Sequence, residues 1–365
     1  GFSGQVVVNT MNHRKESFDT EYDAKATLDA ARHSTIHVQA VHPEDNVGTN
    51  LADELTPLNY YTILSDEEPA SVYTNANLRS FYITQPLQIN MENDSLHMRF
   101  YSPVGIKEVT VMAKSPTMDE YVEFVYIDDI PAFADIKTSI KVLEKGLYRT
   151  ESGKVLQFSA EEMNPASLSL KIACNDPYWT KISQIKAKWY IKFVLNGGNP
   201  VTGTPNKNWW GIRPVHCREA VALFLNIGYM CTLEKFQQRV STFQGTFLDN
   251  NRYPVDTSTL ISRLENLSGF DIGLIYSGNG VSGLGGGRTW GVYQKSFLYH
   301  YENSGGCCST IFHELGHCLG YNHNSTMTYG QWASGCADVF YKNNIKDFPV
   351  NSHTILKSRS NPNIY

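Results

Sequence analysis

The sequence from residue 313 to residue 323 reads His313-Glu314-Leu315-Gly316-His317-Cys318-Leu319-Gly320-Tyr321-Asn322-His323. In an α-helix, residues four positions apart lie about 40° apart around the axis, so His313 and His317 would project their imidazoles to one side. The opposite side of the same helical wheel is apolar and carries Cys308, Ile311, Phe312, Leu315, Cys318 and Leu319. The stretch therefore predicts a helix that is buried on one face and offers a pair of metal ligands on the other.

A third histidine follows this helix shortly after a glycine. Gly320 tolerates the left-handed backbone conformation that ends a helix, so the chain can turn back and bring His323 to the same point. Three neutral imidazoles bind zinc and leave its fourth position for water. Glu314 lies about 100° around the helix from His313, where a general base would stand beside that water. The alternatives are a closed structural zinc site or histidines that only form hydrogen bonds, but structural sites favour cysteine-rich sets of four ligands.

The pattern HExxHxxGxxH resembles the long zinc-binding consensus of the metzincin metallopeptidases, and every defining position is filled in this sequence. The resemblance implies a zinc-dependent endopeptidase whose active-site helix lies under a twisted sheet, with the substrate along an edge strand. It implies Zn²⁺ as the cofactor and a protein or peptide, glycoproteins included, as the substrate. By this resemblance the metal ligands are His313, His317 and His323, and Glu314 is the catalytic base.

Metzincins also place a methionine in a turn beneath the metal, and Met327 is the only methionine after His323. Residues 325–329 read Ser-Thr-Met-Thr-Tyr, which is similar to the S-x-M-x-Y turn of the astacins and serralysins. In those branches the tyrosine can act as an additional zinc ligand, and Tyr329 takes that role by resemblance. The loop between His323 and Met327 is shorter here than in those branches. Either the turn is compact, or Met327 and Tyr329 are ordinary core and surface residues.

Length and composition favour a globular protein of two domains. The chain has 365 residues, 41% of them hydrophobic, and a formal net charge of −5, so a basic surface for nucleic acid is not expected. No apolar run approaches the roughly 18 residues that a membrane span needs.

The seven cysteines favour a secreted, periplasmic or cell-surface location. Cys318 is expected to be a buried thiol, and one or two disulfides are expected among Cys217, Cys231, Cys307, Cys308 and Cys336. The oligomeric state stays open.

The pattern along the chain changes twice. Residues 1–55 mix short elements, with a strand at 6–8, a helix over 21–32 and a strand at 36–40. Residues 56–185 contain strand-like segments at intervals of about ten residues or a little more, separated by Pro, Gly, Asn and Asp, which predicts an antiparallel β-sandwich of immunoglobulin or fibronectin type. Such a module can dock a substrate or a surface, or only pack against its neighbour.

Residues 186–365 are predicted to form the metzincin-like catalytic domain, so the overall fold class is α+β or α/β. We expect a strand at 188–195, a helix from Pro214 to about Asn226 with Gly228 as its stop, a helix capped by Asp256, and a strand at 270–276. The glycine-rich run 278–288 is expected to form a mobile rim over a cleft, and residues 290–301 the edge strand.

Two other functions compete with the endopeptidase. The chain could be a cell-surface binding or adhesion protein whose zinc site is vestigial, although the intact Glu314 argues against this. It could also be a zinc hydrolase that acts on something other than a peptide.

Overall fold

The computed structural model describes residues 61–66, 71, 75, 79–194, 197–199, 202–301 and 307–351, and the backbone of short strands at 35–36, 38–39 and 58–59. The strand expected at 6–8 and the helix expected over 21–32 lie outside the described residues. The chain folds into two compact units. Within the described residues, a strand-rich unit comprises 86–180 and the short strands up to residue 63. An α/β unit comprises 64–85 and the residues from 181 onward.

The strand-rich unit contains two antiparallel four-stranded sheets. The first has the order β4-β10-β7-β6, built from Tyr61–Thr62, Ala134–Ser139, Ser95–Phe100 and Leu87–Glu92. The second has the order β13-β8-β9-β2, built from Ser169–Ala173, Ile106–Lys114, Val122–Ile130 and Val38–Gln39. Alternate side chains of both sheets meet in one hydrophobic cluster that includes Met98, Phe100, Val109, Phe124 and Ile136. The antiparallel strands predicted for this part of the chain are therefore present.

Smaller elements complete the strand-rich unit. Strands β11 (Gly146–Arg149) and β12 (Val155–Phe158) form a separate antiparallel hairpin, and β1 (Thr35–Ile36) pairs with β3 (Leu58–Asn59). A 3₁₀ turn, η2, spans Pro165–Ser167. Helix α3 (Pro177–Ile182) lies where the chain passes into the α/β unit.

The α/β unit is built on a mixed sheet with the order β17-β18-β16-β14-β5. Strands β14 (Tyr190–Phe193), β16 (Gly269–Ile275) and β18 (Thr289–Val292) run parallel to one another. Strands β5 (Ser80–Tyr82) and β17 (Gly283–Gly286) pair antiparallel at the two edges, and β15 (Trp209–Trp210) pairs with the end of β16. The protein is therefore of mixed α+β class.

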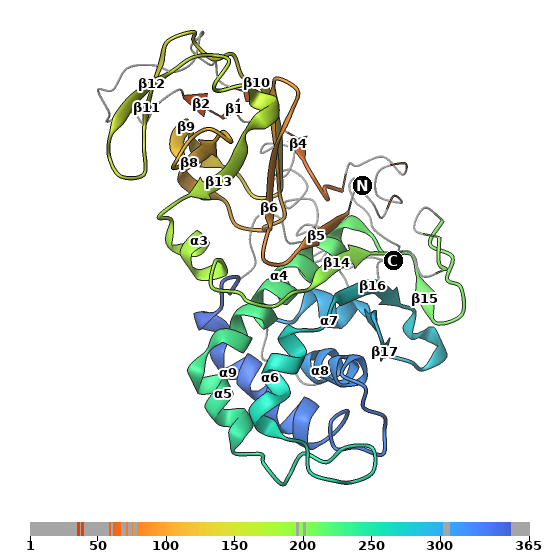
Figure 1. Cartoon of the computed structure of the whole chain (residues 1–365). Helices are drawn as coiled ribbons and strands as arrows, with labels where there is room; N and C mark the ends of the chain where they lie inside the picture. The colour runs from red at the N-terminus through yellow and green to blue at the C-terminus, as the bar shows by residue number, and fades with distance from the viewer. Residues whose placement is uncertain are drawn as a thin grey trace. The chain divides into compact units, whose positions relative to one another are not determined.

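The α/β unit also contains the helices that Figure 1 shows in green to blue, of which the helix Cys307–Cys318 packs against β17 and β18. They are α4 (Pro214–Thr232), α5 (Glu234–Ser241), α6 (Thr257–Glu265), α7 (Gln294–Leu298), α8 (Cys307–Cys318) and α9 (Val339–Asn344). Shorter turns are η3 (Ser277–Asn279), the π-helix η4 (Gln331–Asp338) and η5 (Ile345–Asp347). As predicted, Pro214 begins α4, and the Asp256 carboxylate caps α6 by accepting a hydrogen bond from the Ser258 N–H.

Two predicted boundaries in the α/β unit are wrong. Helix α4 continues past Gly228 to Thr232, because the glycine lies inside the helix against Ile185, where a Cβ would come within 3.0 Å of Ile185 Cγ2. The edge strand is the glycine-rich β17 rather than residues 290–301. Of the latter, 289–292 form the inner strand β18 and 294–298 form α7.

Residues 64–85, all of which were predicted to belong to the β-sandwich of 56–185, contribute to the α/β unit instead. Strand β5 extends its sheet by pairing with β14. Asp66 accepts hydrogen bonds at 2.9 and 3.3 Å from the guanidinium of Arg218, a side chain of α4 that is fully buried. This early segment is therefore bonded both to the sheet and to the central helix.

None of the six cysteines whose side chains the structure describes forms a disulfide, namely Cys174, Cys217, Cys231, Cys308, Cys318 and Cys336. The disulfides expected among Cys217, Cys231, Cys308 and Cys336 are therefore not present, whereas Cys318 is the buried thiol that was expected. The Cys307 side chain lies outside the described residues. Among the described helices, none has the length and apolar character that crossing a bilayer requires.

Candidate metal centre

Helix α8 has the two faces that its sequence predicted. Ile311, Phe312 and Leu315 are fully buried, whereas His313 and His317 are only partly buried. Two indoles fix the buried face, since Trp290 Nε1 donates to the Ile311 carbonyl and Trp332 Nε1 donates to the Phe312 carbonyl. The helix is therefore held rigidly with its histidine face toward solvent.

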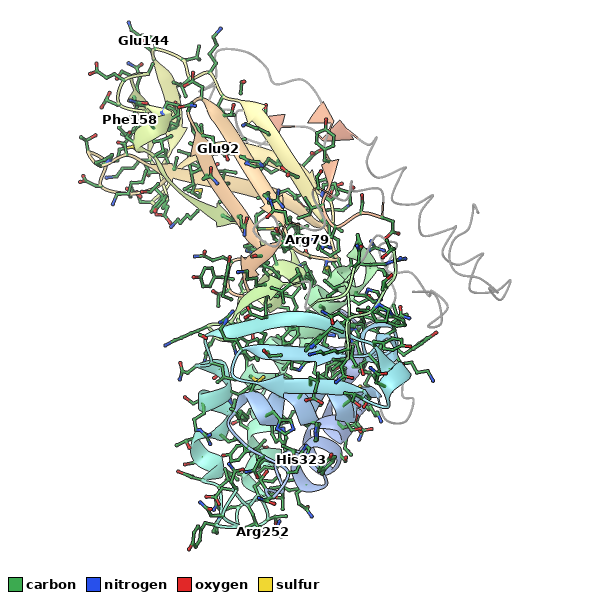
Figure 2. All side chains as sticks on the ribbon, turned by 90° about the vertical axis from the view of Figure 1, so that its right-hand side faces the viewer. Arg79, Glu92, Glu144, Phe158, Arg252 and His323 are labelled. Carbon is green, nitrogen blue, oxygen red and sulfur yellow. The ribbon has the colours of Figure 1, made fainter. Side chains whose placement is uncertain are left out.

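Gly320 ends this helix in the left-handed conformation, with φ of 98°. Its N–H donates to the His317 carbonyl at 2.9 Å, and the N–H of Tyr321 donates to the Gly316 carbonyl at 3.1 Å. These two bonds form a Schellman motif, which satisfies the last carbonyls of the helix and turns the chain back on itself. The reversal brings His323 to the other histidines, and Figure 2 labels it on the side of the sheet where the helices lie.

The three histidines converge on one point. His317 Nε2 lies 3.2 Å from His313 Nε2 and 3.1 Å from His323 Nε2, and one ring nitrogen from each residue lies within 4.8 Å of the others. Three nitrogens that bind one tetrahedral zinc at about 2.05 Å are about 3.3 Å apart. The spacing of these nitrogens therefore fits a metal ion, and the three residues could hold one.

The tautomers of two of these histidines are set by backbone carbonyls. His313 Nδ1 is hydrogen-bonded to the Thr328 carbonyl, and His317 Nδ1 lies 2.8 Å from the Tyr321 carbonyl. A carbonyl oxygen only accepts, so both Nδ1 atoms carry the proton and both Nε2 atoms present lone pairs. Burial lowers the pKa of His313 to about 4 and also lowers the pKa of His317, which keeps both rings neutral. Facing lone pairs repel unless a cation lies between them.

Glu314 lies beside this cluster. Its side chain is almost fully buried, and its Oε2 lies 3.9 Å from His313 Nε2. Burial raises the pKa of the carboxyl to about 8. A cation bound by the histidines would favour the carboxylate and lower that pKa, which suits a group that accepts and returns a proton near neutral pH.

The predicted turn at residues 325–329 packs directly under and beside the helix. Met327 is fully buried, and a Cβ built on Gly316 would overlap the Met327 carbonyl oxygen. The next residue, Thr328, supplies the carbonyl that orients His313. Tyr329 is 57% exposed, with its ring centroid 4.4 Å from that of His313 and 5.0 Å from that of His323. The structure thus brings all six residues singled out in the sequence into one region.

A cleft of about 460 Å³ opens over the histidines. Strand β17 forms one wall, α8 the floor, and the turn at 328–329 with the start of η4 the other wall. Among the described residues that line it, the side chain of Glu314 is the only carboxyl group, and the histidines are the only basic groups.

Sequence reasoning missed what the glycines of β17 do. A Cβ built on Gly283 would overlap the Glu314 carboxylate, and one built on Gly285 would come within 2.7 Å of the Glu314 carbonyl oxygen. The run lines the cleft, as predicted, but residues 283–286 form a strand that passes very close to the helix. The alternation of glycine at 283 and 285 is the signal that could have indicated a close backbone approach. The carbonyls of Thr328 and Tyr321, which orient the rings of His313 and His317, could not be predicted from the sequence, because every residue has a backbone carbonyl.

Comparison with known proteins gives no match to a protein-family model, to a curated protein or to a solved structure. The function must therefore be inferred from the geometry of this site.

Proposed function

We propose that this protein is a zinc-dependent endopeptidase of the metzincin type. The observation that carries the proposal is the meeting of three imidazole Nε2 atoms, two of them with tautomers set by carbonyls, beside the buried Glu314. Imidazole suits zinc among the common metals, and a set of three leaves room for a fourth, exchangeable ligand. The compact turn with Met327 and the adjacent Tyr329 are further features in keeping with this family.

When bound, zinc supplies a Lewis acid that polarises a carbonyl and acidifies water. The protein's own part is proton transfer. In this proposal Glu314 takes a proton from the attacking water and gives it to the departing amine. Burial under β17 excludes bulk water from its carboxylate, so the proton is passed within the cleft. Tyr329 lies next to two of the histidines and would offer its hydroxyl as a hydrogen-bond donor to the developing oxyanion.

The edge strand favours a peptide over a smaller substrate. Within the described residues, β17 pairs only with β18, so the backbone groups of its other side are open to a further strand. An extended peptide can pair with such an edge through its main chain, and this would lay a peptide bond over the histidines. The substrate class we propose is therefore protein or peptide, with glycoproteins included.

A chelation experiment tests the proposal. The purified protein is incubated with a mixed pool of proteins and glycoproteins, with zinc, with a chelator, and with zinc restored, and new peptide ends are identified by mass spectrometry. We expect cleavage that the chelator abolishes and zinc restores. Glu314→Gln should retain zinc and lose turnover by about 10²- to 10⁴-fold. Glu265→Gln on α6 is the matched control and should cleave like the wild type.

Retained turnover in Glu314→Gln would refute the role of this residue as the base. Complete lack of zinc-dependent cleavage, with zinc bound, would favour a binding or adhesion protein with a vestigial site. Products without new peptide ends would indicate a hydrolase for another bond. A secreted, periplasmic or cell-surface location stays a prediction. The six described cysteines form no disulfide that would support it.

A further inference from the structure

The third histidine is held differently from the other two. His313 and His317 lie on a rigid helix, and each ring is fixed by a carbonyl. His323 follows the helix on a turn and is exposed, and among the described residues no hydrogen bond to its Nδ1 is found. The position of His323 therefore depends on how the backbone of its turn is held.

The chain enters this turn through Gly320, which is the least restrained residue type. A glycine in the left-handed region has access to many neighbouring backbone conformations, so it permits the reversal without fixing its direction. Local hydrogen bonds restrain part of this turn, such as the one between the Tyr321 carbonyl and His317 Nδ1. Further hydrogen bonds reach residues 320–324 from other segments of the α/β unit.

Arg263 of α6 donates to the Tyr321 hydroxyl at 2.8 Å, and the loop after α5 holds the backbone of the turn. Asn250 bonds with both ends of its side-chain amide, since Nδ2 donates to the Gly320 carbonyl at 3.1 Å and Oδ1 accepts from the Asn322 N–H at 2.7 Å. The amide thus bridges the residue at the end of the helix and the residue immediately before His323. Two bonds from one planar group restrain both the position and the orientation of the segment between them.

The same loop also bonds beyond the histidine. Arg252 Nη1 donates to the Asn324 carbonyl at 3.0 Å. Further along, the Leu248 N–H donates to Thr326 Oγ1 at 2.7 Å, and the Thr326 N–H donates to the Leu248 carbonyl at 3.0 Å. The backbone is therefore held on both sides of His323 by residues 248–252.

We propose that Asn250 is a positioning residue for the metal centre: it holds the backbone so that His323 Nε2 meets the Nε2 atoms of His313 and His317. The proposal rests on the proposed metal site. Residues that orient metal ligands without touching the metal change affinity by about 10- to 100-fold when they are removed. Asn250 would act through the backbone that carries His323 rather than through the imidazole ring of His323.

The experiment measures zinc affinity rather than turnover. Wild type, Asn250→Ala, Arg252→Ala and Asn251→Ala are prepared metal-free, and their dissociation constants are determined by competition with a chromophoric chelator. Asn251 is the matched control because it is exposed on the same loop and contributes its backbone N–H, bound at 2.9 Å by the Asp249 carboxylate. We expect a loss of about 10- to 100-fold for Asn250→Ala, a smaller loss for Arg252→Ala and none for Asn251→Ala.

Two further readouts separate positioning from a merely structural role. The melting temperature of the metal-free protein should change little in Asn250→Ala, because the bonds that are lost lie at the surface. The visible spectrum of the Co²⁺-loaded variant should differ from that of the wild type, since the third nitrogen no longer holds its place in the coordination sphere.

An unchanged zinc affinity in folded Asn250→Ala would overturn the proposal while leaving the metal site standing. If that variant does not fold, an unchanged affinity in Arg252→Ala would overturn the claim that this loop positions His323. A wild-type protein that binds no zinc would overturn both this proposal and the proposed function.

Discussion

Gly283, in the edge strand β17, lies against Glu314 so closely that a Cβ on the glycine would overlap the carboxylate. The position of the candidate base thus depends on the absence of a side chain on the strand next to it. The same strand forms the open edge of the cleft, so one short segment both confines the base and offers the backbone with which we expect a peptide to pair.

Gly283→Ala should therefore displace the Glu314 carboxylate and reduce kcat. Misplacement of a catalytic group by about 1 Å can cost about 100-fold in rate, whereas zinc affinity should change little, because the contacts of the added methyl group are with the glutamate. Steady-state kinetics and chelator competition measure the two effects. The control is the double variant with Glu314→Gln. If the alanine acts through the glutamate, it should add almost no further loss there, and fully additive losses would contradict the argument.

The buried Glu314 also makes a prediction about pH. In the metal-free protein its pKa is raised to about 8, against an ordinary value of 4.5. Between these values the folded state retains a proton that the unfolded state has released, so the free energy of unfolding should fall as pH rises. Glu314→Gln removes this dependence. We expect the variant to gain stability over the wild type by at most about 1.4 kcal/mol per pH unit between about pH 6.5 and 8.

Urea denaturation of both metal-free proteins across that interval measures the difference. The interval avoids His313, whose lowered pKa acts in the opposite sense: its stabilising effect is lost as pH falls from 6.5 toward about 4. A difference between variant and wild type that stays constant above pH 6.5 would show that the carboxyl is not buried as described.

Zinc should stabilise the protein because it binds the three histidines only in the folded arrangement. At free zinc about 100-fold above the dissociation constant, the gain in the free energy of unfolding is about 2.7 kcal/mol. His323→Ala should lower zinc affinity by at least about 100-fold, since it removes one of three nitrogens. His97→Ala in strand β7 of the strand-rich unit is the control. If chelator competition gives His323→Ala the same zinc affinity as the wild type, only two histidines bind the metal.

The ion pair between Asp66 and Arg218, neither of which lines the cleft, predicts an effect on stability. Asp66→Ala leaves a fully buried guanidinium without this carboxylate and should reduce the free energy of unfolding by about 1 to 3 kcal/mol. Lys235→Ala breaks the exposed pair with Asp347 and should cost less than about 1 kcal/mol. Denaturant unfolding monitored by tryptophan fluorescence compares them. Similar losses for both variants would mean that the segment at 64–85 is not held to α4 as described.

Much of the candidate site could be predicted from local sequence. The spacing of His313 and His317 follows from the period of a helix, and the turn at Gly320 follows from the one residue type that takes the left-handed conformation without strain. The strands at 188–195 and 270–276, the Pro214 start and the Asp256 cap are likewise local signals, and the structure has each of them.

The parts that sequence reasoning missed depend on contacts between distant residues. Strand β17 has no hydrophobic alternation. Its glycines at 283 and 285 are needed because a side chain there would overlap Glu314 of helix α8. Strand β5 joins the sheet across more than one hundred positions of chain, and Gly228 continues a helix because Ile185 packs against it.

The sequence by itself thus determined which atoms could bind a metal, because those residues are neighbours on one helical turn and its reversal. Only the tertiary structure decided how they are held: by carbonyls at 321 and 328, by a glycine strand beside Glu314 and by Asn250 beside the turn. The physical reason is that helical periodicity is a property of adjacent residues, whereas close packing and hydrogen bonding between segments depend on where the whole chain brings them.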